Sequence, residues 1–340
     1  MKLSGSNILI TGGNGFIGAN LVNRLSQLSD TRIRLVDNMD REQQYSIANN
    51  NANVETIIGD LRDSNLCNEV CKGIDIIFHL ASKAGSMEYY KKNAFEVFSH
   101  NVMIDNLLIS AAIENKVNFF GYVSSAFVYP IELMSQIDSP PILESQDLPA
   151  NPAISYGWAK FMGERSLQYA LKNNQKMKGA IYRLANVYGP GQSIDLDRGS
   201  IIPVLIRRAL EYPKLAPYKI YGEGIETRSY CHINDVLEAI CISVDIKDSD
   251  QLIGPVNIGG EHRISMKDLA NLIIEISGKE IILSHQEALP PTTLSQSLNC
   301  NKAQDLLNGW SPKISLMSGL QSMYNYIEKK IKSEKMTENV

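Results

Sequence analysis

Two residues with acid–base chemistry, Tyr156 and Lys160, stand four positions apart, a spacing that puts both side chains on one face of a helix. A phenol with an ordinary pKa of about 10 is a poor base at neutral pH, but a neighbouring ammonium favours the phenolate. The pair could therefore exchange a proton with a substrate hydroxyl. Ser124 and Ser125 end a strand-like run, and a serine hydroxyl there could share that proton with Tyr156. By spacing alone, the Tyr–Lys pair also fits a solvated helix face, and the serines also fit a loop cap.

A glycine-rich turn precedes these residues in the chain. Residues 11–18 read TGGNGFIG and contain a G-x-G-x-x-G pattern between a short apolar run and a helical pattern. Glycines permit a tight turn and a close approach of a pyrophosphate to the helix N-terminus, whose N–H groups donate to it. Asp37 ends the next strand-like run, 19 positions after Gly18, where a carboxylate could accept from the ribose hydroxyls of adenosine. Because Asn38 rather than an arginine adjoins it, the sequence favours NAD over NADP.

Strand-like and helix-like segments alternate through the first half of the chain. The alternation predicts an α/β fold with a Rossmann-type, doubly wound parallel sheet and right-handed crossovers. Later, frequent Pro and Gly predict a smaller α/β C-terminal substrate lobe. We expect an NAD-binding Rossmann domain at 1–186, a substrate-binding lobe at 187–330 with segments around 230–256 returning to the first domain, and a charged tail at 331–340. The strand-like segments are 7–10, 33–36, 54–58, 74–80 and 119–124, and the helix-like ones are 16–28, 97–113 and 156–171.

Composition excludes several other classes of protein. Against 33 Lys and Arg stand 37 Asp and Glu, and this balance argues against a nucleic-acid partner. No run approaches the roughly 18 apolar residues of a membrane helix, and no signal peptide pattern opens the chain, so we expect a cytoplasmic protein. The 5 cysteines and 5 histidines are scattered, which predicts neither a disulfide framework nor a metal site. We expect His79 to be a packed or hydrogen-bonded residue of a buried strand.

Together these motifs resemble the extended short-chain dehydrogenase/reductases, specifically the NAD-dependent nucleotide-sugar epimerases and dehydratases. The resemblance runs along nearly the whole chain. It is carried by Thr11–Gly18, Asp37, Gly59-Asp60-Leu61, His79-Leu80-Ala81-Ser82, Asn101, Ser124-Ser125-Ala126, Tyr156 with Lys160, Arg183–Pro190, Glu226–Ser229 and Gly309–Pro312.

The resemblance implies NAD as the cofactor and a UDP-, GDP- or dTDP-linked sugar as the substrate. It implies a catalytic triad in which Ser125 supplies a hydroxyl, Tyr156 is the acid/base, and Lys160 holds the nicotinamide ribose. It also implies a homodimer through helices near 97–113 and 157–171. The implied cofactor contacts are Gly12, Gly13, Asn14, Gly15, Phe16, Ile17, Gly18, Asp37, Asn38, Asp60, Leu61, Leu80, Ala81, Ser82, Asn101, Ser124, Tyr156 and Lys160, and the implied substrate contacts are Ser86, Met87, Ser125, Asn186, Ser200, Ile201, Tyr221 and Arg228.

Departures from the family pattern narrow the reaction. The 4,6-dehydratases carry Asp-Glu directly after the hydroxyl residue of the triad, where this chain has Ala126-Phe127. The frame Ser-Ser-Ala-x-x-Tyr-Pro, the Ser86-Met87 loop and Arg207-Arg208 are similar to GDP-mannose 3,5-epimerases and GDP-fucose synthases. Those enzymes need a cysteine and a second acid/base. Phe127 stands at the cysteine position, and Gly199-Ser200-Ile201 stand at the other.

With dehydration and proton removal at C3 and C5 disfavoured, the reaction that remains is hydride transfer at C4 of the sugar. The sequence therefore favours a nucleotide-sugar 4-epimerase that works through a transient 4-keto intermediate. A 4-dehydrogenase or 4-ketoreductase is the alternative, and a 3,5-epimerase is less favoured. A non-catalytic NAD-binding protein is disfavoured because the triad is intact. Relatives often place an arginine near 294–299, where this chain has no cation, so pyrophosphate binding is expected to depend on Arg228 and backbone donors.

Overall fold

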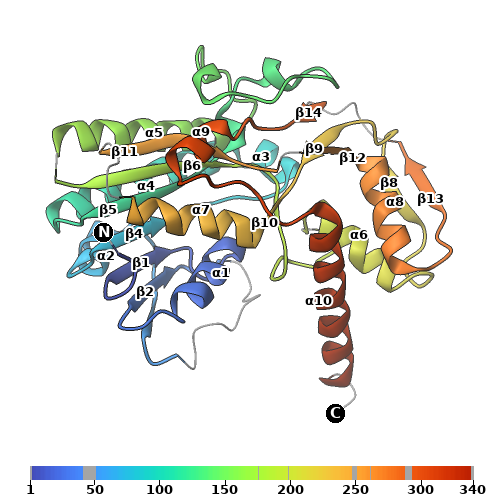
Figure 1. Ribbon diagram of the computed structural model, residues 1–340, viewed down its shortest axis with the longest axis horizontal. Helices are drawn as coiled ribbons and strands as arrows, with labels where there is room; N and C mark the ends of the chain where they lie inside the picture. Colours follow the sequence, from blue (N-terminus) through green and yellow to red (C-terminus); the bar gives the residue numbers. More distant parts are fainter. Residues whose placement is uncertain are drawn as a thin grey trace.

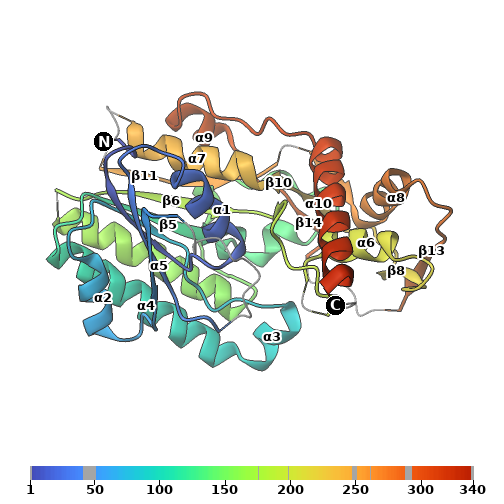
Figure 2. The same ribbon diagram turned by 90° about the horizontal axis from the view of Figure 1, so that it is seen from below.

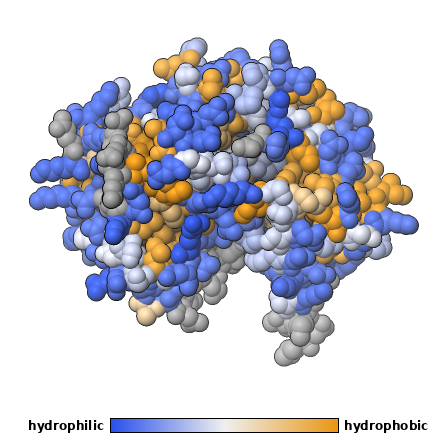
Figure 3. Space-filling view, viewed as in Figure 1, coloured by the Kyte–Doolittle hydropathy of each residue, from blue (hydrophilic) through white to orange (hydrophobic). Residues whose placement is uncertain are grey.

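The structure is a computed structural model that describes residues 2–40, 51–174, 176–197, 199–246, 251–260, 262–287 and 293–337. Figure 1 shows a large lobe built on a parallel sheet and a smaller lobe beside it. Hydrophilic and hydrophobic residues are interspersed over the face seen in Figure 3, as on the surface of an ordinary globular protein. Among the described residues, no helix is both long enough and apolar enough to cross a bilayer.

Seven described strands form the sheet of the large lobe, in the order β11-β6-β5-β4-β1-β2-β3, and every neighbouring pair is parallel. This arrangement confirms the predicted Rossmann-type fold. The strand order reverses beside β1, so the carboxyl ends of β1 and β4 flank the crevice where such sheets bind ligands. The strands are β1 (Asn7–Thr11), β2 (Arg32–Asp37), β3 (Val54–Ile58), β4 (Ile76–His79), β5 (Phe119–Ser125), β6 (Lys178–Leu184) and β11 (Leu252–Ile258).

Helices cover both faces of this sheet, which explains why β1 and β4 read as continuous apolar runs. One face packs against α1 (Phe16–Leu25) and α7 (Ile233–Asp245). The other packs against α2 (Ser64–Cys71), α4 (Ala94–Glu114) and α5 (Ser155–Asn173), as Figure 2 shows. Shorter elements of this lobe are α3 (Met87–Lys92), η1 (Ala126–Val128), η2 (Ile131–Met134) and η3 (Glu144–Gln146).

The smaller lobe has its own apolar core, formed mainly between α6 (Ile201–Leu210), α8 (Met266–Ser277) and α10 (Leu316–Thr337). Helix α9 (Asn301–Leu306) instead packs on β11 of the large lobe. Short strands complete the fold: β7 (Val187–Tyr188) with β10 (Cys231–His232), β9 (Thr227–Ser229) between β12 (Arg263–Ser265) and β14 (Ser295–Gln296), and β8 (Tyr218–Tyr221) with β13 (Leu283–Gln286).

Two segments bear on the expected division of the chain. Helix α7 packs against α1, and β11 pairs with β6, so residues 233–258 contribute to the large lobe. The boundary between 186 and 187 stays a prediction. Residues 331–337, expected in a charged tail, instead continue α10. The reason is an apolar stripe with helical spacing that ends at Ile331 and packs into the core of the smaller lobe; its members are Leu320, Met323, Ile327 and Ile331.

Candidate active site

The glycine turn follows β1 and opens α1, as the sequence predicts. A Cβ on Gly12 would lie 2.8 Å from the backbone of Ala81, and one on Gly18 would lie 2.2 Å from the Gly12 carbonyl oxygen. Gly12 also has a φ of +67°. Only glycine fits these positions, because the turn, the start of α1 and the segment after β4 approach one another this closely. No side chain caps α1 at Gly15, so its first N–H groups can bind a phosphate.

Asp37 is held beside this turn by the backbone. Its carboxylate accepts from the N–H of Asn14 at 3.0 Å and from the N–H of Met39 at 2.9 Å. Asn38 stands between Asp37 and Met39 in the sequence. The structure therefore brings the whole predicted group together at the carboxyl ends of β1 and β2: Gly12, Gly13, Asn14, Gly15, Phe16, Ile17, Gly18, Asp37 and Asn38.

The predicted residues after β3 and β4 lie farther along the same sheet edge. Asp60 forms an ion pair of 2.6 Å with Arg62, whose donated hydrogen bonds lower the pKa of that carboxyl. Asn101 of α4 is buried and makes a pair of hydrogen bonds with the backbone of Lys83, at 2.7 and 3.0 Å. Asn101 thereby fixes the segment that carries Leu80, Ala81 and Ser82. Within the described part of the chain, the buried Ser82 Oγ has no hydrogen-bond partner. Leu61, beside Asp60, is buried.

Tyr156, the second residue of α5, lies between two other aromatic rings. The Tyr90 ring, from α3, stacks on it with centroids 5.3 Å apart and an angle of 24° between the planes. The Phe127 ring, from η1, meets it edge-on at 6.2 Å. Ser125 ends β5, and its Oγ accepts from the N–H of Phe127 at 3.2 Å. The structure therefore gathers Ser125, Phe127 and Tyr156 at the carboxyl end of β5.

Lys160, one turn further along α5, is only 1% exposed. Its ammonium lies 4.8 Å from the centroid of the Tyr122 ring, at cation–π distance. Burial lowers the pKa of Lys160, while the nearby Asp105 and Glu164 carboxylates oppose this shift. His79, expected to be a packed residue, is fully buried at the end of β4 and binds Asp105 and Thr11.

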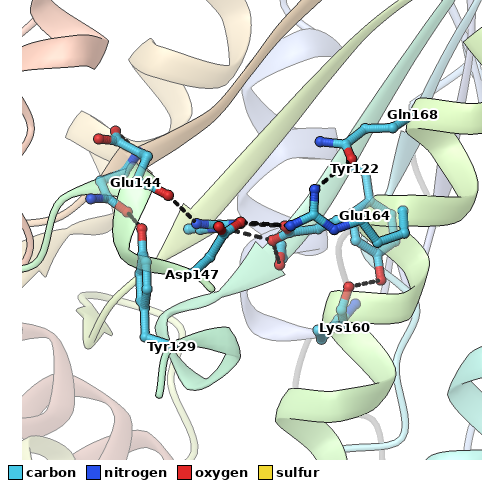
Figure 4. A network of polar contacts seen from close by, with 11 residues as sticks. Tyr122, Tyr129, Glu144, Asp147, Lys160, Glu164 and Gln168 are labelled. Carbon is cyan, nitrogen blue, oxygen red and sulfur yellow. Dashed lines mark hydrogen bonds and ion pairs between the residues drawn. The ribbon is translucent and has the colours of Figure 1, made fainter. Parts of the chain in front are cut away.

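The side chain of Ser124, a predicted cofactor contact, lies in a buried polar network with Glu164. Figure 4 shows Glu164 and Asp147 of this network. The Ser124 hydroxyl donates to Glu164 at 2.5 Å, and Arg183 pairs with Glu164 at 2.6 Å and with Asp147 at 2.7 Å. The Arg183 guanidinium also lies 4.8 Å from the centroid of the Tyr129 ring. This network joins β5, α5 and β6 behind the site, so a cofactor contact from Ser124 would come from its backbone.

The predicted phosphate-binding residues Asn186 and Arg228 meet where the two lobes join. Asn186, with a φ of +45°, donates to the Ser229 carbonyl at 2.9 Å and to Gln296 at 3.1 Å. Arg228 donates to the carbonyls of Thr227 and Thr293, at 2.7 and 3.0 Å. Burial lowers the pKa of Arg228, and it takes part in none of the ion pairs among the described residues. An anionic group would therefore compensate this partly buried cation.

Sequence reasoning missed Gln296, which is paired directly with Arg228 in the β14–β9 register. The two residues are 68 positions apart, so only the strand pairing brings them together. Sequence reasoning also missed Tyr90 on the short helix α3. Ser86 caps α3 by accepting from the N–H of Tyr89 at 3.2 Å. The sequence signal that could have identified Tyr90 is its position four residues after this cap.

The other predicted substrate contacts occupy helix and strand ends. Met87 begins α3 and is exposed. Ser200 and Ile201 stand at the start of α6, where the Ser200 hydroxyl accepts from Gln192 at 3.5 Å. Tyr221 ends β8 in the smaller lobe and is 55% exposed. The role of Tyr221 in substrate binding stays a prediction. No group of three or more His, Cys, Asp or Glu that could hold a metal ion occurs among the described residues.

Known proteins resemble this chain along nearly its whole length. The sequence model of the NAD dependent epimerase/dehydratase family matches residues 8–259. GDP-mannose 3,5-epimerase of Arabidopsis thaliana is 28% identical over 328 residues, covering 96% of this chain and 84% of that protein. Among solved structures, UDP-glucuronic acid 4-epimerase of Bacillus cereus in complex with NAD is 27% identical, with a TM-score of 0.79 and coverage of 95% and 96%. UDP-glucose 4-epimerase of Thermotoga maritima has a TM-score of 0.81 at 24% identity, covers 96% of this chain and 99% of that one, and supports the fold.

Proposed function

Because the chain belongs to the NAD dependent epimerase/dehydratase family, we propose that it is a nucleotide-sugar 4-epimerase acting through a transient 4-keto sugar. The observation that carries the proposal is the surroundings of Tyr156. Phe127, which cannot exchange a proton, packs edge-on against its ring at the position that follows Ser125 and Ala126. Chemistry at the hydroxyl of one carbon is therefore better supported than proton removal from neighbouring ring carbons.

NAD is the cofactor, and the residues present fit it. Gly12 approaches Ala81 so closely that only glycine fits there, and no side chain caps the start of α1 at Gly15, so the first N–H groups of α1 can bind a pyrophosphate. Asp37 lies beside the turn, where its carboxylate would bind the adenosine ribose. The buried Ser82 hydroxyl, which has no partner within the described residues, would gain one from the cofactor. When bound, NAD supplies the hydride acceptor and donor.

Tyr156, Ser125 and Lys160 would perform the proton chemistry. Tyr156, as phenolate, removes the proton of the C4 hydroxyl, while the Ser125 hydroxyl donates a hydrogen bond to the same oxygen. Lys160 holds the nicotinamide ribose and stabilises the phenolate through its positive charge. After the 4-keto sugar presents its other face, Tyr156 returns the proton to the C4 oxygen. The same residue removes and returns the proton, so the sugar undergoes inversion at C4 with no net redox change.

A 3,5-epimerase is a second candidate, and one observation favours it. Tyr90 places an ionisable phenol against the ring of Tyr156, where it could act as an additional acid/base. The Arabidopsis thaliana relative, 28% identical to this chain, carries the name of that activity. This alternative requires Tyr90 to take the place of the cysteine that the family resemblance leads us to expect at Phe127.

The substrate side of the proposal depends on Arg228, a partly buried cation. Arg228 would bind the pyrophosphate of a UDP-, GDP- or dTDP-linked sugar, since its guanidinium matches phosphate oxygens in a forked geometry. Gln296 would orient Asn186 beside it through their hydrogen bond of 3.1 Å. The sugar would then extend from Arg228 in the smaller lobe toward Tyr156 in the large lobe.

We also propose a cytoplasmic homodimer. Helices α4 and α5 pack side by side on one face of the sheet (Figure 2) and expose a set of large apolar side chains. Burial against a second copy would remove these side chains from water. The free cysteines suit a reducing compartment. A Met162→Glu substitution is expected to convert the dimer to a monomer in light scattering. The exposed side chains are Phe95, Phe98 and Met103 of α4 and Trp158, Met162 and Tyr169 of α5.

One experiment separates these reactions. Purified protein is incubated with NAD in D2O and a panel of UDP-, GDP- and dTDP-linked hexoses and hexuronates, and proton NMR is recorded together with absorbance of the reduced cofactor. Inversion at C4 without solvent deuterium on the ring and without accumulation of NADH supports the 4-epimerase. Stoichiometric NADH would make the protein a dehydrogenase, or a reductase assayed in reverse. Deuterium at C3 or C5 would support the 3,5-epimerase and refute the first proposal.

A further inference from the structure

The buried ammonium of Lys160 needs a compensating negative charge, because an unpaired charge in the protein interior is costly. Two buried carboxylates act on it, Glu164 on its own helix and Asp105 on α4. Glu164 is already engaged by Arg183 at 2.6 Å and by Ser124 at 2.5 Å. Asp105 is therefore the carboxylate that remains to balance Lys160.

Asp105 ends a chain of buried hydrogen bonds that begins at the glycine turn. Its two oxygens bind the Tyr122 hydroxyl at 2.6 Å and His79 Nε2 at 2.9 Å. His79 Nδ1 lies 2.7 Å from Thr11 Oγ1. The same oxygen accepts from the N–H of Ala81 at 3.2 Å. The chain thus connects β1, β4, α4 and β5 beneath Lys160.

The protons along this chain can be assigned. Burial lowers the pKa of His79, so its ring is neutral and carries one N–H. Since the Asp105 carboxylate only accepts, His79 Nε2–H donates to it, and Nδ1 accepts from the Thr11 hydroxyl. Tyr122 donates to the other carboxylate oxygen. The chain is then fully satisfied with a single negative charge on Asp105, opposite the single positive charge on Lys160.

Tyr122 contacts both charged groups, the Lys160 ammonium through its ring and the Asp105 carboxylate through its hydroxyl. The ammonium lies 4.8 Å from the ring centroid, while the hydroxyl at the edge of the ring donates to Asp105. A phenol that donates to a carboxylate becomes richer in electrons, and this strengthens the attraction of its face for a cation. Gly163 provides the space for the pair: a Cβ there would lie 2.1 Å from the Tyr122 hydroxyl oxygen and 2.3 Å from Asp105 Oδ2.

We propose that Asp105 and Tyr122 are positioning residues for Lys160: the Tyr122 ring seats the ammonium, and Asp105 supplies the charge that keeps it protonated. This inference rests on the proposed role of Lys160 in holding the nicotinamide ribose and supporting Tyr156. The titratable groups that face Lys160 or its partners are Asp105 from α4, His79 from β4, Tyr122 from β5, and Glu164 and Tyr156 from α5.

The test compares Asp105→Asn and Tyr122→Phe with matched variants elsewhere. Asp235→Asn changes another buried aspartate, which accepts from the N–H of Ile314, and Tyr182→Phe removes the hydroxyl of a buried tyrosine on β6 that bonds to Ser243. Tyr182 belongs to the core on the α1 side of the sheet, whereas Tyr122 belongs to the core on the α5 side. The controls therefore remove equivalent groups away from Lys160.

The first measurement is an NMR titration of 15N-lysine protein without NAD, in which Lys160→Arg identifies the Lys160 signal. We expect the midpoint of Lys160 to fall by roughly one pH unit or more in Asp105→Asn. A smaller shift in the same direction is expected in Tyr122→Phe, and no shift is expected in either control. Because Tyr122→Phe keeps the ring and its packing, it preserves the test if Asp105→Asn fails to fold.

The second measurement is the affinity for NAD between about pH 6 and pH 10, which spans the ordinary ranges of histidine and lysine. Affinity should decline with rising pH at a lower pH in Asp105→Asn and Tyr122→Phe than in the parent and the controls. An unchanged Lys160 midpoint and an unchanged pH profile in both variants would overturn the proposal. Neither measurement uses a sugar, so a protein that epimerises nothing in the panel would refute the proposed function and leave this test intact.

Discussion

Replacing Arg183 with methionine should destabilise the protein strongly, because Arg183 is the cation that pairs with Glu164 and Asp147, two carboxylates labelled in Figure 4. The fully buried guanidinium binds both oxygens of Glu164, at 2.9 and 2.6 Å, and Asp147 at 2.7 Å. Methionine fills similar volume but leaves Glu164 charged and buried, with Ser124 as its one remaining hydrogen-bond partner among the described residues. Breaking a buried ion pair on one side costs about 3–5 kcal/mol, and we expect a loss of stability in that range.

Urea unfolding followed by the fluorescence of Trp158 and Trp310 measures this loss. Lys313→Met is the control, since it breaks an exposed pair with Glu238 and should cost less than about 0.5 kcal/mol. The double variant of Arg183→Met with Glu164→Met removes the uncompensated charge as well, so it should cost less than the sum of the two single changes. A cost below about 1 kcal/mol for Arg183→Met, or simple additivity in the double variant, would refute this reasoning.

Three further predictions concern buried histidines, Arg228 and Lys279. Burial lowers the pKa values of His79, His100 and His232. Below about pH 6.5 the unfolded chain therefore binds more protons than the folded one, and the free energy of unfolding should fall as the pH drops. His79→Gln, which keeps a donor and an acceptor, should make this free energy depend less steeply on pH, as measured by urea titrations at several pH values. Arg228→Met should raise the KM for the nucleotide sugar by roughly 10- to 100-fold with NAD affinity unchanged, measured by steady-state kinetics and calorimetry. Lys279 donates to two carbonyls at the end of α6, at 2.9 and 2.6 Å, so Lys279→Met should cost about 1–2 kcal/mol in urea unfolding.

Features that follow from local sequence were predictable, because glycine turns and apolar runs leave direct patterns. The alternation of segments predicted the parallel sheet, and TGGNGFIG followed by Asp37 predicted the turn and its carboxylate, which the backbone N–H of Asn14 holds in place. Ser124 shows the limit of such reasoning. Adjacent strand residues face opposite sides, and the sequence does not specify which of the two serines faces α5. Long-range register was equally hidden, since nothing local pairs Gln296 with Arg228.

Buried polar contacts help to fix the rotation of α5 about its axis. On β5, Tyr122 and Ser124 are two residues apart and face the same side of the sheet, toward α5. On α5, Lys160 and Glu164 are four residues apart and share one face of the helix. Tyr122 contacts Lys160 and Ser124 contacts Glu164, so the two pairs interlock.

Each charge of this interlocked set has a partner outside it, Asp105 for Lys160 and Arg183 for Glu164. Turning or sliding α5 would separate both pairs at once and leave two buried charges uncompensated, whereas an apolar interface would tolerate small shifts. Tyr156 lies one turn before Lys160 on the same helix, so these contacts place its backbone, while the rings of Tyr90 and Phe127 pack against its side chain. This explains how α5 can hold an acid/base in one position, and why changes at Asp105 or Arg183 should alter the position of Tyr156.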